Sequence, residues 1–322
     1  MANVTPSESA RAWARSLPTV DTVIERVENH YGLGVTRAVL ARSFTNDVYR
    51  VDAGAQSYAL KIYGVGRFTT DEVRWEQQLA RHVLTAGLSV AADVALLGGD
   101  TVGVLPAPEG ERPFALTEWV PGEKPQPPWT DALYRTVGAT LARFHEAADT
   151  LDSRYPRHTM RTGDETREVI EVLSDSPQRR NLVQRTADAA EQQLTRLADE
   201  GLRWGIRHGD PSLDNLHVSD DGGLHLYDFD LAGPGWQVED LTGALSTEFG
   251  DVFLAGYTSI RPLPPVELEA LPWLRIVGTI DNLHFHLIGK PAVQGTYSLT
   301  EGWVDSGFES LAKVASQVGW SP

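Results

Sequence analysis

The sequence contains no cysteine among its 322 residues. Disulfide bonds, thiolate nucleophiles and thiolate metal ligands are therefore excluded. Long apolar runs are also missing, because no stretch reaches the roughly eighteen consecutive apolar residues that indicate a membrane-spanning helix. Residues 1–18 have no apolar signal core either, so we expect no export, no membrane partner and a cytoplasmic protein.

Positive charge is scarce. The chain has 28 Lys and Arg against 44 Asp and Glu, a formal net charge of -16, which makes nucleic acid a poor partner. Residues 208–260 contain no Lys or Arg, and their acidic residues are Asp210, Asp214, Asp220, Asp221, Asp228, Asp230, Glu239, Asp240, Glu248 and Asp251. Solvated surface explains Asp220 and Asp221, whereas a metal site and a cationic acceptor are functional interpretations of the others.

The remaining composition, 41% hydrophobic and 22% charged, is typical of a globular protein, and 322 residues are enough for two lobes. The part up to about residue 118 is rich in strand-forming residues. It contains runs over 48–51, 57–63, 102–105 and 114–119. One helix is expected over 70–86, with Thr69 or Thr70 as its N-cap and Gly87 at its end.

Residues 121–128 include four prolines, which neither a helix interior nor a central strand accommodates. Beyond them the apolar spacing predicts helices over 133–148, 181–198, 238–250, 265–288 (interrupted at Pro272) and 305–318. We therefore predict a mixed α/β fold of the α+β type. Its parts are a β-rich N-terminal lobe over 1–118 with a helical extension to about residue 30, a connection over 119–128, and a mainly helical C-terminal lobe over 129–322.

A β-hairpin is predicted after the middle of the chain. Two short apolar runs, 216–218 and 224–227, flank residues 219–223, which are typical of a turn. In the register that we consider, Val218 faces Leu224 across that turn.

That register places Asn215 opposite Tyr227 and so one residue from Asp228, with Asp210 just upstream in the preceding loop. Oxygen atoms of Asp and Asn suit Mg²⁺, which also keeps waters and phosphates as ligands. A separate Asp beside the metal suits a base for a hydroxyl group. This is the minimum set of groups for phosphoryl transfer.

Lys61 lies in the middle of the apolar run 58–63, on the face opposite Leu60. It is either a protective lysine on an edge strand or a lysine that binds nucleotide phosphates. Glu76 lies on the apolar face of the expected helix and needs a counter-charge, which Lys61 would supply. Glu72 competes for this role, although a position in the first turn favours a partner of the helix dipole.

Taken in order, these features resemble the aminoglycoside phosphotransferase and choline kinase superfamily, with its protein-kinase-like fold. They are a strand lysine, a helix glutamate, a Pro-rich connection, His-Gly-Asp with Asn five residues on, and Asp-Phe-Asp at a strand end. The resemblance covers about residues 43–245 and includes the helical segment 138–145. The combined pattern is specific, whereas Asp-Phe-Asp alone is not.

The resemblance implies catalytic roles for single residues. Asp210 would be the catalytic base or would orient the acceptor hydroxyl. Asn215 and Asp228 would bind Mg²⁺. Lys61 would contact the nucleotide phosphates, and Glu76 would hold Lys61.

The resemblance also implies supporting roles. Backbone groups of Glu118 to Val120 would bind the adenine edge. His208 would pack within the catalytic loop, and Asp240 would buttress that loop from the following helix. Asp230 would either reach a metal or the acceptor, or lie in solvent.

The loop between the first two strands, residues 43–47, differs from the family pattern because it has no glycine. A Gly-rich loop lets backbone amides approach phosphate closely. Here the side chains of Ser43, Thr45 and Asn46 would replace some of those amides. This loop is similar to that of the homoserine-kinase-like and bacterial stress-kinase-like branches, which have an Asn before the Val-Tyr strand.

We therefore expect an O-phosphotransferase that moves the γ-phosphate of ATP or GTP, with Mg²⁺, to a hydroxyl of a small molecule. The acceptor could be cationic, or an antibiotic such as an aminoglycoside, and the protein a monomer or homodimer. Alternatives are a stress-type protein Ser/Thr kinase and a homoserine- or choline-like metabolite kinase. Two other classes are an Asp-x-Asp glycosyltransferase using residues 228–230 and an inactive nucleotide-binding module. His284 and His286 are expected in the core or an acceptor cleft rather than as a metal pair.

Overall fold

The computed structural model describes residues 15–159 and 163–319. The described chain divides into two compact units. The first holds residues 15–127, 147–158 and 213–230, and the second holds the other described residues. Two later segments thus join the N-terminal strands in one unit. The predicted lobe boundaries stay a prediction, and the start of the expected N-terminal extension lies outside the described residues.

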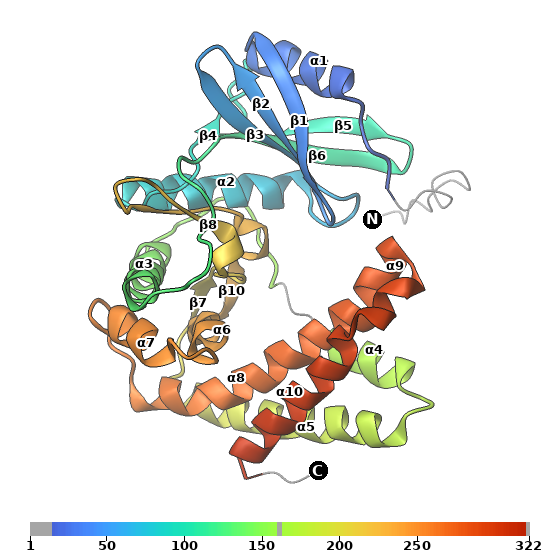
Figure 1. Ribbon diagram of the computed structural model, residues 1–322, viewed down its shortest axis with the longest axis vertical. Coiled ribbons are helices and arrows are strands. Elements are labelled where there is room, and N and C mark those ends of the chain that lie inside the picture. Colours follow the sequence, from blue (N-terminus) through green and yellow to red (C-terminus); the bar gives the residue numbers. More distant parts are fainter. Residues whose placement is uncertain (1–14, 160–162, 320–322) are drawn as a thin grey trace. The chain divides into compact units, whose positions relative to one another are not determined.

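The first unit contains a six-stranded antiparallel sheet in the order β1-β2-β3-β6-β4, with β5 also paired to β6 (Figure 1). The strands are β1 (Val35–Ser43), β2 (Asp47–Ala53), β3 (Gln56–Ile62), β4 (Asp93–Val94), β5 (Gly103–Ala107) and β6 (Gly110–Glu118). Strand β3 is central, so Lys61 is not a protective residue on an edge strand. The four strand-forming runs of the sequence all fall within or overlap these strands.

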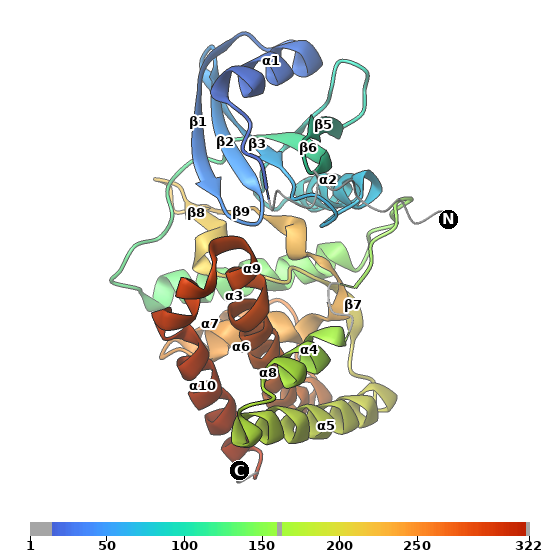
Figure 2. The ribbon, with the colours of Figure 1, turned by 90° about the vertical axis from the view of Figure 1, so that its right-hand side faces the viewer.

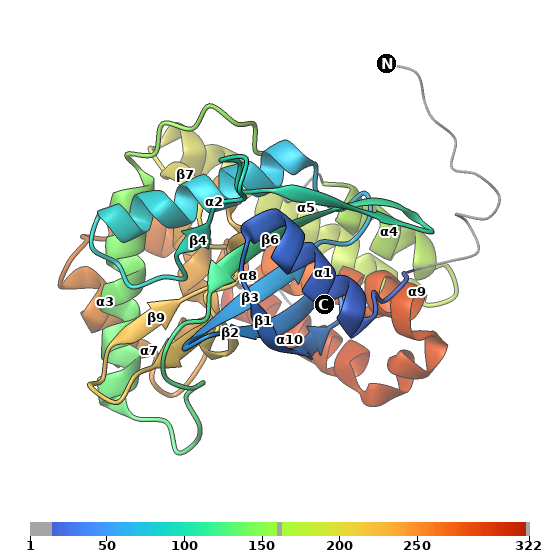
Figure 3. The same ribbon diagram turned by 90° about the horizontal axis from the view of Figure 1, so that it is seen from above.

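Helix α1 (Val20–Tyr31) lies against one face of the sheet, as the view from above shows (Figure 3). Its buried residues pack with those of the sheet in one core, which includes Val23, Val27, Tyr31, Tyr49, Val51, Tyr58, Leu60, Ile62, Phe114 and Leu116. The alternation predicted for β3 is confirmed, because Leu60 joins this core while Lys61 lines a pocket on the opposite face.

Helix α2 (Thr70–Thr85) begins as expected. Thr69 is the N-cap and forms a capping box with Glu72, and Gly87 follows the helix with a φ of +94°, which glycine adopts without strain. Glu72 is therefore occupied at the helix start. Glu76 is only 5% exposed, on the buried face.

The predicted hairpin is present as β8 (Leu216–Val218) and β9 (Leu224–Leu226), within the first unit. Val218 faces Leu224 in the observed register, so the sequence-based register is confirmed. The Tyr227 N–H donates to the Asn215 carbonyl oxygen at 3.1 Å, which extends the pairing by one step.

The second unit is mainly helical (Figure 2). It contains most of α3 (Asp131–Ala148), and also α4 (Asp164–Val172), α5 (Pro177–Asp199), α6 (Thr242–Leu245), α7 (Gly250–Thr258), α8 (Pro265–His284), α9 (Lys290–Gln294), α10 (Trp303–Gln317) and the strand pair β7 (Trp204–Arg207) and β10 (Gly233–Trp236). Helices α4, α5, α8 and α10 enclose its core. The sheet-rich first unit and this helical unit confirm the predicted α+β class.

Two helix predictions need correction. Residues 238–250 do not form one helix but a 3₁₀ turn, the short α6 and a loop before α7, because Asp240 is drawn into tertiary hydrogen bonds described below. Helix α8 runs through Pro272 without interruption and continues into a π-helical turn over Phe285–Gly289. Burial of Leu274, Ile276 and Ile280 offsets the hydrogen bond that the proline removes.

No helix within residues 15–159 and 163–319 combines the length and the apolar character needed to cross a bilayer.

Candidate active site

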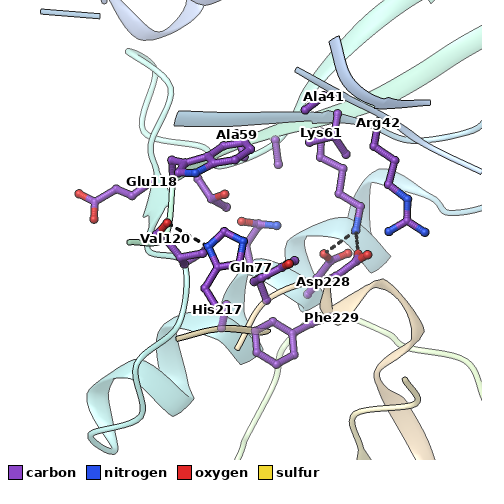
Figure 4. A pocket seen from close by; sticks show the side chains of 18 of the residues that line it. Ala41, Arg42, Ala59, Lys61, Gln77, Glu118, Val120, His217, Asp228 and Phe229 are labelled. Atoms are coloured by element: carbon purple, nitrogen blue, oxygen red, sulfur yellow. Dashed lines mark hydrogen bonds and ion pairs between the residues drawn. The ribbon is translucent and has the colours of Figure 1, made fainter. Parts of the chain in front are cut away.

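A pocket of about 310 Å³ lies in the first unit, on the sheet face opposite α1. Strands β1, β2, β3 and β6 form one wall, α2 forms another, and the hairpin and the segment after β6 complete it. Lys61, Glu118, Val120, His217 and Asp228 are among the residues that line it (Figure 4). The pocket therefore gathers most of the first-unit residues predicted to bind a nucleotide.

Lys61 is the centre of the charged end of this pocket. Its Nζ lies 2.5 Å from Asp228 Oδ1, 3.4 Å from Glu76 Oε1 and 3.6 Å from Asp230 Oδ2. The Lys61–Glu76 pairing inferred from the sequence is thus present in the geometry, and it joins a central strand to α2. Figure 4 shows the Lys61 side chain extending from the sheet toward Asp228.

Burial alone would lower the pKa of the Lys61 ammonium. The carboxylates of Asp228, Asp230 and Glu76 outweigh that effect and hold its pKa well above the usual value. Burial raises the pKa of Glu76, although the Lys61 ammonium opposes the shift. Lys61 is therefore a permanent cation surrounded by acids.

Asp228 has a φ of 67°, the only positive φ of a non-glycine residue in the described part of the chain. Such a conformation is uncommon outside glycine and is enriched at functional sites. The backbone hydrogen bond from Tyr227 to Asn215 keeps Asn215 and Asp228 close together at the open end of the hairpin.

Carboxylate and amide oxygens of this kind fit a hard cation such as Mg²⁺. Within residues 15–159 and 163–319, no group of three His, Asp or Glu side chains is arranged to hold a metal ion by itself. A metal held by Asn215 and Asp228 would thus need further oxygens from a nucleotide phosphate chain.

Asp230 is not in solvent, so that alternative is wrong. It is 6% exposed, accepts a hydrogen bond from Asn46 Nδ2 at 2.7 Å and lies 3.5 Å from an Arg67 nitrogen. Together with its contact to Lys61, this places Asp230 in the network that positions the lysine.

Two of the three side chains predicted to bind phosphate in the β1–β2 loop form hydrogen bonds with other residues of the protein. Ser43 Oγ donates to Asp47 Oδ1 at 2.7 Å. Asn46 binds Asp230 through its amide nitrogen and accepts a backbone N–H through its amide oxygen. Thr45 is half-buried. Phosphate binding by this loop stays a prediction. Thr45 would need the least rearrangement of the three side chains, because Ser43 and Asn46 would first have to break their hydrogen bonds to Asp47 and Asp230.

The segment after β6 has part of its backbone already bonded. The Glu118 N–H donates to the Ala92 carbonyl at 2.8 Å, and the Trp119 N–H donates to the Ser57 carbonyl at 2.9 Å. The adenine edge would therefore depend on the Val120 N–H and on carbonyl groups. Of the backbone N–H groups expected to bind adenine over Glu118 to Val120, those of Glu118 and Trp119 are already bonded within the protein.

His217 of β8 forms part of the pocket wall, a position that the sequence interpretation missed. Its Nδ1 lies 3.4 Å from the Val120 carbonyl oxygen, and its ring meets the Tyr227 ring edge-on at 5.0 Å. Burial lowers the pKa of His217, which favours a neutral ring. A wall formed by uncharged aromatic rings suits a purine base better than a charged wall.

The second unit contains the other predicted cluster. Asp240 accepts the His208 N–H at 2.6 Å and the Gly209 N–H at 3.0 Å, and its Oδ2 lies 3.0 Å from His145 Nε2. His145 Nδ1 is 2.8 Å from the Tyr257 hydroxyl. Although burial raises the pKa of Asp240, the hydrogen bond from His145 and nearby charges bring it below its usual range. Asp240 thus holds the backbone that precedes Asp210.

Gly209 explains why this loop takes its path. Its φ is +86°, and a Cβ there would come within 2.2 Å of the Leu231 carbonyl oxygen. Asp210 follows, half-buried, with its N–H 3.4 Å from His208 Nδ1. The chain passes from the second unit to the first after Ser212, so the convergence of Asp210 with Asn215 stays a prediction.

His284 and His286 both have partners within the second unit. His284 Nε2 lies 2.8 Å from Glu168 Oε2, and His286 stacks on Trp303 with ring centroids 5.6 Å apart. Neither contact indicates a metal pair.

The sequence interpretation also missed Arg112 and Arg42. The Arg112 side chain is fully buried, donates to Asp47 Oδ2 at 2.7 Å and to the Tyr63 carbonyl at 2.8 Å, and so anchors the β1–β2 loop. Arg112 lies between the strand-forming runs 102–105 and 114–119, and nothing in the sequence there marks it as buried. Arg42 lines the pocket itself, and its neighbours in the sequence give no sign of that.

Comparisons with known proteins give the family. The model of the phosphotransferase enzyme family matches residues 36–264. An uncharacterized protein of Deinococcus radiodurans is 30% identical, with 93% of each chain covered. Amicoumacin kinase of Bacillus subtilis is 25% identical over 78% of this chain and 80% of its own, and homoserine kinase of Polaromonas naphthalenivorans is 26% identical over 74% and 77%.

Solved structures share the fold at lower identity. An amicoumacin kinase in complex with AMP-PNP, Ca²⁺ and Ami has a TM-score of 0.75 at 20% identity, covering 91% of this chain and 93% of its own. A microcompartment-associated aminopropanol kinase has a TM-score of 0.75 at 21% identity, covering 93% and 98%. The predicted resemblance is confirmed, and the glycosyltransferase alternative falls away. The chain belongs to the phosphotransferase enzyme family, and its reaction class is phosphoryl transfer to an alcohol group.

Proposed function

We propose that this protein transfers the γ-phosphate of ATP to a hydroxyl group of a small, amine-bearing molecule, in the cytoplasm. The observation that carries the proposal is Lys61, which lies on a central strand, faces a pocket and contacts both Glu76 and Asp228. A buried lysine clamped by acids in a concave site is a group prepared for a polyanion.

The residues divide the work as follows. The base would rest against the wall that includes His217 and near the Val120 backbone, and Lys61 would bind the phosphate chain. Asp228 and Asn215 would hold a divalent metal ion, for which we propose Mg²⁺, and this ion would neutralise charge on the phosphoryl group. Glu76 and Asp230 would keep Lys61 in place once Asp228 turns to the metal.

Asp210 would take the proton of the acceptor hydroxyl as the new P–O bond forms and the bond to ADP breaks. Its loop is held by the Asp240 carboxylate through two backbone N–H groups. Asp240 therefore acts as a positioning residue rather than a base.

The acceptor class rests on charge and on relatives. The net charge of -16 favours a cationic acceptor, and one relative by fold acts on aminopropanol, an amino alcohol. Antibiotics bearing amines belong to the same chemical class, since two other relatives are an amicoumacin kinase and a spectinomycin phosphotransferase. A panel of amino alcohols and aminated antibiotics, assayed with ATP and with GTP by nucleotide consumption, would identify the acceptor and the donor.

Asp210→Ala tests the assignment of the base. We expect acceptor-dependent ATP consumption to fall about 10²- to 10⁴-fold, because the hydroxyl loses its proton acceptor. Nucleotide affinity, measured by calorimetry, should change little. Asp214→Ala is the control, since Asp214 is an exposed acid four residues further on. Full activity of Asp210→Ala would contradict the proposed role.

A further inference from the structure

The β1–β2 loop leaves a question about how the phosphate chain is held. The loop has no glycine, and the Ser43 and Asn46 side chains bind other residues of the protein. Lys61 itself is surrounded by three carboxylates, and Arg67 lies against one of them, Asp230, so both of these cations are already paired with acids of the protein. A nucleotide tail carries several negative charges and needs a further cation there.

Arg42 is that cation by position. Both Ala41 and Arg42 line the pocket, and the Arg42 and Lys61 side chains extend into it from the sheet (Figure 4). The guanidinium group forms no hydrogen bond or ion pair with another residue in the described part of the chain, although Arg37 on the same strand pairs with Asp52.

A β-bulge is the reason that Arg42 faces the pocket. Leu40 pairs with Tyr49 but Arg42 pairs with Val48, so β1 contains one extra residue, Ala41, at this point. In a regular strand Leu40 and Arg42 would share a face. Leu40 instead packs against the core, and the bulge turns Arg42 to the opposite face.

The register then aligns Arg42 with Lys61. Arg42 pairs with Val48, and Val48 pairs with Lys61. Directly paired residues point to the same face of a sheet, and neighbouring strands lie about 4.8 Å apart. The two cations therefore rise from the same face about 10 Å apart at their backbones, within reach of one phosphate chain.

We propose that Arg42 binds the phosphate chain of the nucleotide donor and replaces the backbone amides of a Gly-rich loop. This inference rests on the proposed function, because it assumes that the pocket holds a nucleotide. The planar guanidinium fork suits phosphate oxygens, which it can bind through two N–H groups. Arg42 and Lys61 would then grip the chain from two strands.

The test compares ligands with and without phosphates on the full-length protein. Binding of adenosine, ADP and ATP is measured with Mg²⁺ present, by calorimetry or by competition, for wild type, Arg42→Ala and Arg42→Lys. We expect Arg42→Ala to weaken ADP and ATP binding about tenfold or more and to leave adenosine binding unchanged. Arg42→Lys should lie between wild type and alanine, because it keeps the charge without the fork.

Arg37→Ala is the matched control, since it removes the same charge from the same strand at a residue that does not line the pocket. It should bind all three ligands as wild type does. An equal loss of adenosine and ADP binding in Arg42→Ala, or no loss of ADP binding, would overturn the role of Arg42. A wild-type protein that binds neither ADP nor ATP would instead overturn the proposed function.

Discussion

At the scale of single residues, the charged end of the pocket depends on how Lys61 shares its three acidic neighbours. Asp228 is the nearest of the three to Lys61, yet it is also the residue that would bind a metal ion. If Asp228 turns to the metal, Glu76 and Asp230 are the acids that remain to orient the lysine. The position of Lys61 during the reaction then depends on Glu76 more than the shortest distance suggests.

Glu76→Gln tests this dependence. The substitution keeps the shape of the side chain but removes its charge, so we expect the phosphate contact of Lys61 to loosen. The KM for ATP should rise, and kcat should fall on the order of tenfold or more, because misplacement of a positioning group is costly. Steady-state kinetics with ATP as the varied substrate measures both.

Glu72→Gln serves as the control for that experiment. It makes the same change one helical turn earlier in α2, where Glu72 completes the capping box with Thr69. We expect a loss of stability of about 1 kcal/mol or less and unchanged kinetics. Equal kinetic losses in the two variants would show a general effect of α2 rather than a role for Glu76.

Lys61 and Glu76 could be found from the sequence because each places a charge within an apolar pattern, and a buried charge needs a partner. Arg42 could not be found this way. Its orientation depends on one extra residue in β1, and no sequence pattern predicts a bulge at Ala41. Arg112 was missed for a similar reason, since only the fold brings Asp47 to it.

At the scale of elements, local chemistry explains which predictions succeeded. The hairpin register follows from a short turn and two alternating strands, so Val218 faces Leu224 as the sequence indicates. The helix over 238–250 fails because its geometry is decided elsewhere in the chain. The Asp240 carboxylate accepts hydrogen bonds from the backbone N–H groups of residues 208 and 209, and the chain around Asp240 forms a 3₁₀ turn instead of a regular helix.

Asp240→Asn tests the importance of this tie for the second unit. An amide accepts hydrogen bonds less strongly than a carboxylate and lacks the negative charge that His145 contacts, so we expect the free energy of unfolding to fall by about 2–3 kcal/mol at pH 7. Urea denaturation measures the change. Asp251→Asn, at an exposed acid of α7, should be nearly neutral.

The pH dependence of the same variant has a definite sign. The folded pKa of Asp240 is lower than usual, so its contribution is complete above the unfolded pKa of about 3.9 and is lost as pH falls through the folded pKa. The difference between wild type and Asp240→Asn should therefore be constant from pH 7 to pH 5 and shrink only below about pH 4. A difference that vanished near pH 6 would assign the effect to another group.

At the scale of the whole molecule, the acidic residues of 208–260 do not act as one surface. Glu239 and Asp240 are buried in the second unit, and Asp228 and Asp230 are bound to Lys61 in the first. The exposed members of the run are Asp214, Asp220, Asp221, Glu248 and Asp251. A preference for cationic acceptors would therefore come from the overall charge of -16 more than from this run alone.

This view leads to a prediction about salt. The field of a strongly acidic protein raises the local concentration of a cation, and added salt screens that field over about 10 Å at 0.1 M. We expect kcat/KM for an amine-bearing acceptor to fall several-fold between about 0.02 M and 0.2 M KCl, mainly through KM. The measurement uses saturating ATP, because the same field repels the nucleotide and salt would help it to bind.

An uncharged hydroxyl acceptor separates this field effect from a direct contact. Its KM should hardly change with salt if long-range attraction is the cause. If the KM values of charged and uncharged acceptors rise together, salt acts on the enzyme or on nucleotide binding. If the amine-bearing acceptor shows a low KM that salt leaves unchanged, its ammonium group binds a desolvated acid at short range, where screening is weak, and the overall charge does not determine the preference.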